Sequence, residues 1–145
     1  MQKYDVIFSG GGQVGAVCAN ALAAADLKVA MIEAGSRVKC HSDDERTLRV
    51  SAIANKHLKQ LDDLGIKSLI DRDRIGPYNT MQVWDNHSTG KLTFSGQGPD
   101  NLGAIIENKW LVSAAQQKLQ DAHQVTTFYR HSIASFEQSP RQVKV

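Results

Sequence analysis

Apolar and polar positions in the first 33 residues follow the order of a strand, a turn, a helix and a second strand. An apolar run over residues 4–9 predicts the first strand, and another over residues 28–32 predicts a buried parallel strand. Between the two runs, apolar residues recur at the spacing of a helix with one buried face: Val14, Val17, Cys18, Ala21, Leu22 and Ala25. This order predicts a βαβ unit.

The pattern after this unit predicts a mixture of helices and antiparallel strands. Residues 34–43 are polar and predict a loop, and residues 44–64 predict a helix that Gly65 ends. Residues 71–78 contain Gly76-Pro77 and predict a boundary. The later predictions are a hairpin of strands 80–85 and 91–95, a loop over 96–101, a strand over 102–106, a helix from Asn108 to about Ala122, and strands over 125–130, 132–137 and from 142. Because the last strand is interrupted by the end of the chain, we expect a fragment.

The turn after the first strand has the sequence Gly10-Gly11-Gly12-Gln13-Val14-Gly15. In a dinucleotide site the first glycine permits a sharp turn, the second lets a pyrophosphate approach the main chain, and the third lets the helix pack closely on the strand. The free N–H groups at the helix start favour phosphate. Glu33 follows at the interval expected for an acid that binds a ribose. The turn therefore predicts a dinucleotide site, with a glycine-rich turn in an ordinary βαβ unit as the alternative.

Composition limits the other functions. A chain of 145 residues with a net charge of +2 is long enough for one domain, and it has no dense Lys/Arg cluster that would predict nucleic-acid binding. Cys18 and Cys40 form no metal-binding pattern and suit a reducing compartment. We expect no signal peptide, and no apolar run approaches the ~18 residues of a membrane-spanning helix.

Four segments carry a resemblance to a known family: Tyr4-Asp5-Val6-Ile7 with the glycine turn and Ile32-Glu33-Ala34; Asp44-Glu45-Arg46 with Leu64-Gly65; Met81-Gln82-Val83-Trp84-Asp85; and the run from Leu102 to Asn108. The chain resembles the N-terminal part of a class A flavoprotein aromatic monooxygenase. Within that class it is most similar to the ubiquinone-biosynthesis hydroxylases.

The resemblance implies an α/β fold, namely a Rossmann-like FAD-binding domain of the glutathione-reductase and para-hydroxybenzoate-hydroxylase type. The start of an interleaved substrate-domain β-sheet would accompany it. On this basis residues 1–74 would form the FAD-binding βαβ part, residues 75–106 would contribute strands to the substrate side, and residues 107–145 would return to the FAD-binding domain.

The resemblance also implies a set of FAD-binding residues: Gly10, Gly12, Gln13, Val14, Gly15, Glu33, Ala34, Arg46 and Asn108. Arg46 would lie along the pyrophosphate, with a solvated residue at a helix start as the alternative. Asn108 would face the sugar-alcohol chain of the flavin, with a plain helix cap as the alternative. No catalytic residue is assigned and no metal is expected.

The activity implied for the intact enzyme is hydroxylation of an aromatic ubiquinone precursor, dependent on FAD, on NADH or NADPH, and on dioxygen. We expect these 145 residues alone to have no turnover. Two alternatives stay open: another FAD-dependent oxidoreductase of the amine or hydroxy-acid oxidase type, and a truncated non-catalytic nucleotide-binding fragment. A dehydrogenase that uses only a nicotinamide dinucleotide also stays open, because Glu33 could accept from the ribose of either dinucleotide. A polyprenyl precursor implies peripheral contact with the inner membrane, or with a biosynthetic complex, for a protein otherwise expected in the cytoplasm.

Overall fold

The structure is a computed structural model that describes residues 2–87, 89–96 and 101–145. The chain forms two compact units, one of residues 1–39 with 112–145 and the other of residues 40–111. Each unit has a three-stranded sheet and a separate two-stranded one. The predicted boundaries after residues 74 and 106 do not coincide with this division, and the assignment of those segments to cofactor and substrate sides stays a prediction.

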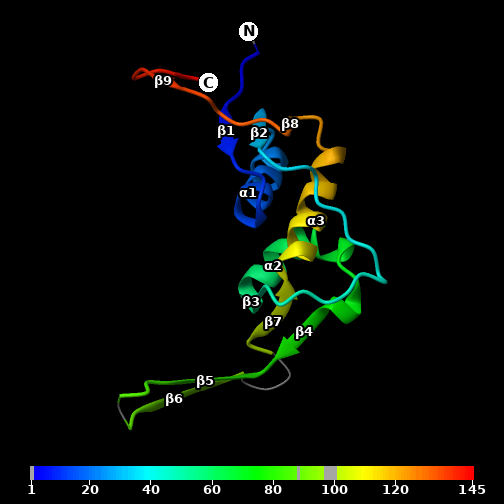
Figure 1. The fold of residues 1–145 in the computed structure, drawn as a ribbon, viewed down its shortest axis with the longest axis vertical. Coiled ribbons are helices and arrows are strands. Elements are labelled where there is room, and N and C mark those ends of the chain that lie inside the picture. Colours follow the sequence, from blue (N-terminus) through cyan, green and yellow to red (C-terminus); the bar gives the residue numbers. More distant parts are fainter. Residues whose placement is uncertain (1, 88, 97–100) are drawn as a thin grey trace. The chain divides into compact units, whose positions relative to one another are not determined.

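The first unit is built on a parallel sheet. Strands β1 (Val6–Ser9), β2 (Val29–Glu33) and β8 (Val125–Tyr129) lie in the order β1-β2-β8, and helix α1 (Gln13–Ala24) connects β1 to β2 (Figure 1). The central strand β2 is apolar and buried from residue 29 to residue 31, as a strand with neighbours on both edges requires. The predicted βαβ unit and the strand over residues 125–130 are confirmed.

The predicted buried face of α1 is wrong. Val14 is 71% exposed, and the helix instead buries Ala16, Ala19, Asn20 and Ala23. Small side chains on this face let the helix backbone approach its neighbours closely. Asn20 is buried because its amide donates to the carbonyls of Ala16 (2.8 Å) and Ala115 (2.9 Å). The larger apolar residues of the helix therefore indicated the wrong face.

Helix α3 (Asn108–Lys118) continues into a tight turn over Leu119–Asp121, which confirms the predicted helix. Leu111, Ala115 and Leu119 on its predicted face are buried. The predicted strand over residues 132–137 is wrong, because residues 131–136 have no regular structure. Strands β9 (Glu137–Gln138) and β10 (Val143–Lys144) pair over two residues each, and this is the whole of the second sheet in this unit.

The second unit is built on an antiparallel sheet of order β3-β7-β4, made of β3 (Val50–Ala54), β7 (Gly103–Glu107) and β4 (Ile75–Tyr78). The predicted helix over residues 44–64 is wrong in its first half, because residues 44–49 are not helical and residues 50–54 pair with β7. The stretch Val50–Ala54 suits either element, and the strand partner decides between them. The remainder forms α2 (Asn55–Asp63).

Gly65 ends α2 as predicted. It has a φ of 69°, its N–H donates to Asp62 O, and the N–H of the fully buried Ile66 donates to Leu61 O, both at 2.8 Å. This is the paired hydrogen bonding of a glycine-terminated helix. Tight turns over Lys67–Leu69 and Arg72–Arg74 then lead into β4.

The predicted boundary at Gly76-Pro77 is instead part of β4, an edge strand in which Pro77 needs no N–H partner. The predicted hairpin is confirmed as β5 (Thr80–Trp84) paired with β6 (Lys91–Ser95), and the strand over residues 102–106 as β7. Most of the predicted loop over residues 96–101 lies outside the described residues.

Candidate dinucleotide-binding site

The glycine turn joins β1 to α1 in a conformation that requires glycine at two positions. Gly10 has a φ of 108°, and its N–H donates to Ile32 O at 2.8 Å. A Cβ on Gly15 would stand 2.1 Å from the carbonyl oxygen of Gly10, far inside van der Waals contact. The helix can therefore begin this close to the end of β1 only if residue 15 has no side chain.

Gly12 faces open space. It lies just before α1 with a φ of −68°, and a Cβ built on it would have no atom within 4 Å. The first hydrogen bond of the helix runs from Ala16 N–H to Gly12 O at 2.9 Å, and no side chain caps this end. The N–H groups at the start of the helix therefore have no acceptor within the helix. These donors and the positive end of the helix dipole face the space in front of Gly12. These features fit a pyrophosphate.

Glu33 ends β2 next to the glycine turn. Its Oε2 accepts from the Gly11 N–H and its Oε1 accepts from the Gly35 N–H, both at 2.7 Å. These bonds fix the carboxylate, and each oxygen keeps a second lone pair that can accept from a ribose hydroxyl. Ala34 is exposed beside it.

Two predicted site residues follow Gly12. Val14 is exposed, and Gln13 is half-buried with its Oε1 buried and without a hydrogen-bond partner among the described residues. Their contribution to an anion site would come from the main chain. The structure thus brings together, in one unit, the glycine turn and the acid at residue 33.

Gln116 of α3 also contacts the turn, and no sequence signal indicated it. Its side chain is 1% exposed, its Nε2 donates to Gly11 O at 2.7 Å, and its Oε1 accepts from Val38 N–H at 2.8 Å. In the sequence it is the first of three consecutive polar residues, Gln116-Gln117-Lys118, and nothing distinguishes it from the other two.

Arg46 and Asn108 both belong to the second unit. Arg46 is exposed and its Nη2 donates to Asp73 O at 3.0 Å. It does not stand at a helix start, because α2 begins nine residues later, at Asn55. Asn108 is the first residue of α3; its Oδ1 accepts from Ser51 Oγ at 2.6 Å, and its N–H donates to Arg49 O at 2.9 Å. Their predicted roles toward FAD stay predictions.

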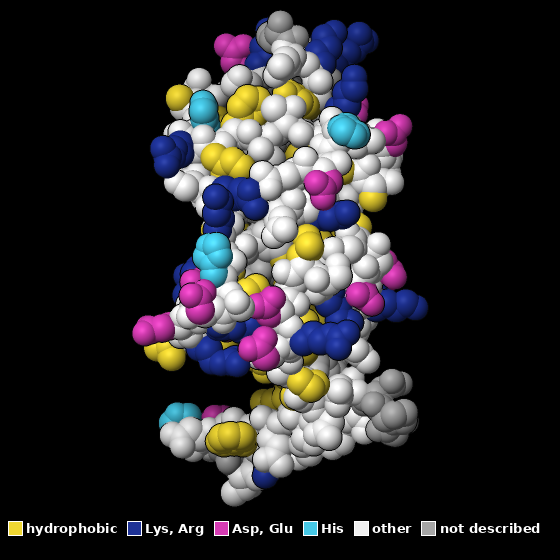
Figure 2. All heavy atoms as spheres, turned by 90° about the vertical axis from the view of Figure 1, so that its right-hand side faces the viewer, with side chains coloured by type: hydrophobic (Ala, Val, Ile, Leu, Met, Phe, Trp, Pro, Cys, Tyr) yellow, Lys and Arg dark blue, Asp and Glu magenta, His cyan; other side chains and the backbone are white. Residues whose placement is uncertain are grey.

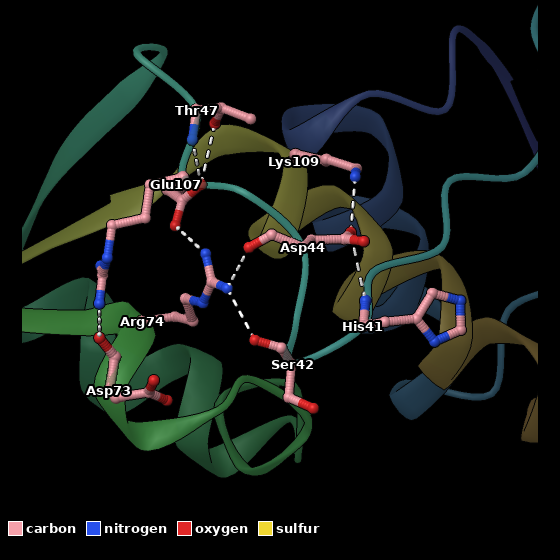
Figure 3. Close-up of polar contacts among 9 residues, drawn as sticks. His41, Ser42, Asp44, Thr47, Asp73, Arg74, Glu107 and Lys109 are labelled. Carbon is pink, nitrogen blue, oxygen red and sulfur yellow. Dashed lines mark hydrogen bonds and ion pairs between the residues drawn. The ribbon is translucent and has the colours of Figure 1, made fainter.

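A buried ion pair at the end of β7 was missed by the sequence analysis. Arg74 Nη1 donates to Glu107 Oε1 at 3.0 Å, and the two side chains are 5% and 6% exposed (Figure 3). The Nη2 of Arg74 donates to the carbonyls of Ser42 (2.9 Å) and Asp44 (2.5 Å). Glu107 Oε2 accepts from both the N–H (2.7 Å) and the hydroxyl (3.0 Å) of Thr47. The pair therefore holds residues 42–47 in place.

These contacts keep the groups charged. The backbone N–H of Thr47, with help from the Arg74 guanidinium, lowers the pKa of Glu107 against the opposing effect of burial. The hydrogen bond to Glu107 raises the pKa of Arg74. At the adjacent pair, Lys109 Nζ lies 2.7 Å from Asp44 Oδ2, which lowers the pKa of Asp44 and raises that of Lys109. Arg74 also lies over the ring of Trp110, 5.4 Å from its centroid.

Among the described residues no group of three His, Cys, Asp or Glu side chains could hold a metal ion. In the part of the chain that the structure describes, no helix is both long and apolar enough to span a membrane. On the face drawn in Figure 2, acidic and basic side chains stand next to one another.

Solved structures of flavin-dependent monooxygenases share the fold of this chain. The p-nitrophenol 4-monooxygenase PnpA from Pseudomonas putida DLL-E4 matches it with a TM-score of 0.67 at 19% identity, over 95% of this chain and 34% of PnpA. The flavin-dependent monooxygenase PieE, solved in complex with FAD and substrate, matches with a TM-score of 0.69 at 18% identity, over 97% of this chain and 26% of PieE. The chain therefore shares a mixed α/β fold with part of these monooxygenases, which is consistent with a partial FAD-binding fold.

The sequence is similar over most of its length to curated ubiquinone biosynthesis monooxygenases. The mitochondrial protein COQ6 of Xenopus tropicalis is 34% identical over 143 residues, which is 94% of this chain and 31% of that protein. Human COQ6 is 34% identical over 133 residues, covering 88% of this chain and 28% of its own length. The chain thus spans about a third of the length of these relatives, and no family model matches it. The predicted resemblance to this group of monooxygenases is confirmed.

Proposed function

We propose that this chain is the N-terminal, FAD-binding portion of an aromatic hydroxylase that uses NAD(P)H and dioxygen and acts on a ubiquinone precursor. The observation that carries the proposal is the glycine turn with its open position at Gly12 and with Glu33 held beside it. The similarity to COQ6 supports the substrate class. The finer fold assignment, a Rossmann-like domain of the para-hydroxybenzoate-hydroxylase type, is part of the proposal.

The residues of the first unit would hold the cofactor at its adenosine diphosphate end. Main-chain N–H groups of Gly12, Gln13, Val14 and Gly15 would donate to the diphosphate, because they lack helical acceptors. Glu33 would accept from the ribose hydroxyls through its remaining lone pairs. The FAD would supply the redox chemistry that inserts one oxygen atom of dioxygen into an aromatic ring, with a nicotinamide as the electron donor. The chain itself would bind and orient the cofactor.

Arg46 and Asn108 are proposed as further FAD ligands, Arg46 toward the diphosphate and Asn108 toward the sugar-alcohol chain. Arg46 has a competitor in Arg49, whose guanidinium has no hydrogen-bond or ion-pair partner among the described residues, whereas that of Arg46 is engaged by Asp73. Comparing Arg46→Ala with Arg49→Ala in FAD titrations decides between them. The proposal predicts the weaker binding for Arg46→Ala; weaker binding for Arg49→Ala alone would move the role to Arg49.

The proposal extends to partners and location. A polyprenylated aromatic precursor is largely apolar, so an enzyme that takes it would work at the surface of the inner membrane or within a biosynthetic complex. The protein would otherwise be cytoplasmic. Sedimentation with phospholipid vesicles, compared with vesicle-free controls, tests the membrane part of this proposal.

The test of the function uses the purified chain with added FAD. Binding is followed by the change in flavin absorbance, and turnover by NAD(P)H oxidation in the presence of phenolic substrates. Binding with substrate-stimulated oxidation supports the hydroxylase; binding with oxidation of amines or hydroxy acids supports a different FAD oxidoreductase.

A second candidate is a nucleotide-binding fragment without turnover, which is favoured by the coverage of only 31% of the COQ6 length. It predicts weak binding of an adenine nucleotide such as ADP, with no oxidation of NAD(P)H under any of these conditions. If neither FAD nor ADP binds, both candidates are wrong.

A further inference from the structure

The peptide groups on both sides of Gly11 are held by side chains. The Gly11 N–H donates to Glu33 Oε2, and the Gly11 carbonyl accepts from Gln116 Nε2, each at 2.7 Å. One partner comes from the end of β2 and the other from α3, in a single compact unit. Neither peptide group beside Gly11 can therefore rotate without breaking one of these hydrogen bonds, of which the bond from Gln116 is buried and the bond to Glu33 is partly buried.

Gln116 has one orientation only. Its Nε2 faces a carbonyl, which can only accept, and its Oε1 faces the N–H of Val38, which can only donate. A flipped amide would oppose donor to donor and acceptor to acceptor. Since the side chain is 1% exposed, water cannot readily replace either partner. The glutamine thus joins the glycine turn to the loop that follows Glu33.

We propose that Gln116 is a positioning residue of the cofactor site. By fixing the Gly11 carbonyl and the Val38 N–H together, it holds the turn that would meet the diphosphate against the loop that follows Glu33, the residue proposed to bind the ribose. A site ordered before binding spends less binding energy on ordering itself. This inference rests on the proposed function, because it concerns the same FAD site.

Asn20 offers a matched control. It is also a buried amide, 6% exposed, and it also joins α1 to α3, through the carbonyls of Ala16 and Ala115. It has no hydrogen bond to the glycine turn or to the loop after β2. Asn20→Leu and Gln116→Met each remove a buried amide with two hydrogen bonds and roughly keep the side-chain size, so we expect their effects on stability to be comparable.

The experiment is titration of the full chain with FAD. Gln116→Met removes both hydrogen bonds of the amide and is expected to weaken FAD binding about tenfold, because the turn and the loop are then no longer ordered before binding. Asn20→Leu is expected to leave the dissociation constant within about twofold of the wild type, whatever its melting temperature. Equal weakening in both variants would mean that Gln116 acts only through stability and would overturn the proposal.

Gln116→Glu adds a readout that a purely structural role would not move. An ionised carboxylate can accept from Val38 but cannot donate to Gly11, whereas the protonated acid can do both. Burial raises the pKa of such a carboxyl. FAD affinity of this variant, relative to wild type, should recover as the pH falls from about 8 to about 5. A ratio that does not change with pH would contradict the proposal.

Hydrogen exchange separates failure of this inference from failure of the proposed function. In the free protein, Gln116→Met should speed exchange of the Val38 amide about tenfold, and Asn20→Leu should not. If the wild type binds no FAD, the proposed function is wrong, and with it the cofactor role of Gln116. If the wild type binds FAD but Val38 exchange is unchanged in Gln116→Met, only the positioning inference is wrong.

Discussion

Addition of one methyl group at Gly12 separates the requirements of folding from those of cofactor binding. The Cβ of Gly12→Ala would have no atom within 4 Å, and the φ of −68° suits alanine. The fold should therefore tolerate the change. The methyl group would instead occupy the space through which a phosphate oxygen approaches the main-chain N–H groups, at about 2.9 Å in a hydrogen bond.

The magnitude follows from the bonds that would be lost. One hydrogen bond to a charged group contributes about 1.5 to 3 kcal/mol, so FAD affinity should fall by about 10- to 100-fold. The melting temperature should change little. Isothermal titration with FAD and thermal unfolding of the same preparations give both quantities.

Two other glycines serve as controls for this measurement. In Gly15→Ala the methyl would stand 2.1 Å from Gly10 O, so overpacking should destabilise the unit by about 1 to 3 kcal/mol or more. In Gly76→Ala the nearest atom is Ile105 O at 3.7 Å, an ordinary contact, and neither quantity should change. If Gly12→Ala bound FAD as well as the wild type, the turn would not be the diphosphate site.

The remaining predictions concern single side chains. Glu33→Gln keeps one acceptor but turns an amide toward the second N–H. It should therefore lose about 1 to 3 kcal/mol of stability, measured by urea unfolding, and about tenfold in FAD affinity, measured by titration. Full stability would contradict the two bonds from Glu33 to the main chain. The pKa of Glu107 is lowered from its ordinary 4.5, so the contribution of its carboxylate to the stability of the fold is complete above that value and is lost as the pH falls through the folded-state pKa. The unfolding free energy, measured from pH 7 to pH 3, should therefore fall less steeply with pH in Glu107→Gln than in the wild type. Tyr129→Phe removes a buried hydroxyl that has no hydrogen-bond partner among the described residues and should raise the unfolding free energy by about 1 kcal/mol; a loss of stability would show that the hydroxyl is bonded.

The elements that the sequence predicted correctly are those with local signals. The βαβ unit follows from two apolar runs and a glycine turn, and the end of α2 follows from Gly65, whose positive φ is a property of one residue. Such signals involve only a few neighbouring residues, so the structure that they predict does not depend on contacts with distant parts of the chain.

The elements that were predicted wrongly depend on partners distant in the sequence. Residues 50–54 alternate in a way that suits a helix or a strand, and only the pairing of Val50 with Glu107 and of Ala54 with Gly103 makes them β3. The buried face of α1 was misjudged because Asn20 is polar, and its burial depends on the carbonyl of Ala115.

The residues of the candidate site likewise fall into two groups, those that local spacing predicts and those that depend on distant contacts. Gly10, Gly12, Gly15 and Glu33 were predicted from spacing, and the structure places them together. Gln116 could not be predicted, because its importance comes from two main-chain groups that lie 105 and 78 residues away. Buried polar contacts of this kind are properties of the folded chain.

The most direct test of the dinucleotide site is backbone NMR of the labelled chain during titration with FAD. The proposed site predicts that the largest shift changes fall on the amides of residues 10–15 and on Gly35, whose N–H bonds Glu33. It would be contradicted if those amides stayed unchanged at saturation while signals elsewhere, such as those of the β5–β6 hairpin, moved.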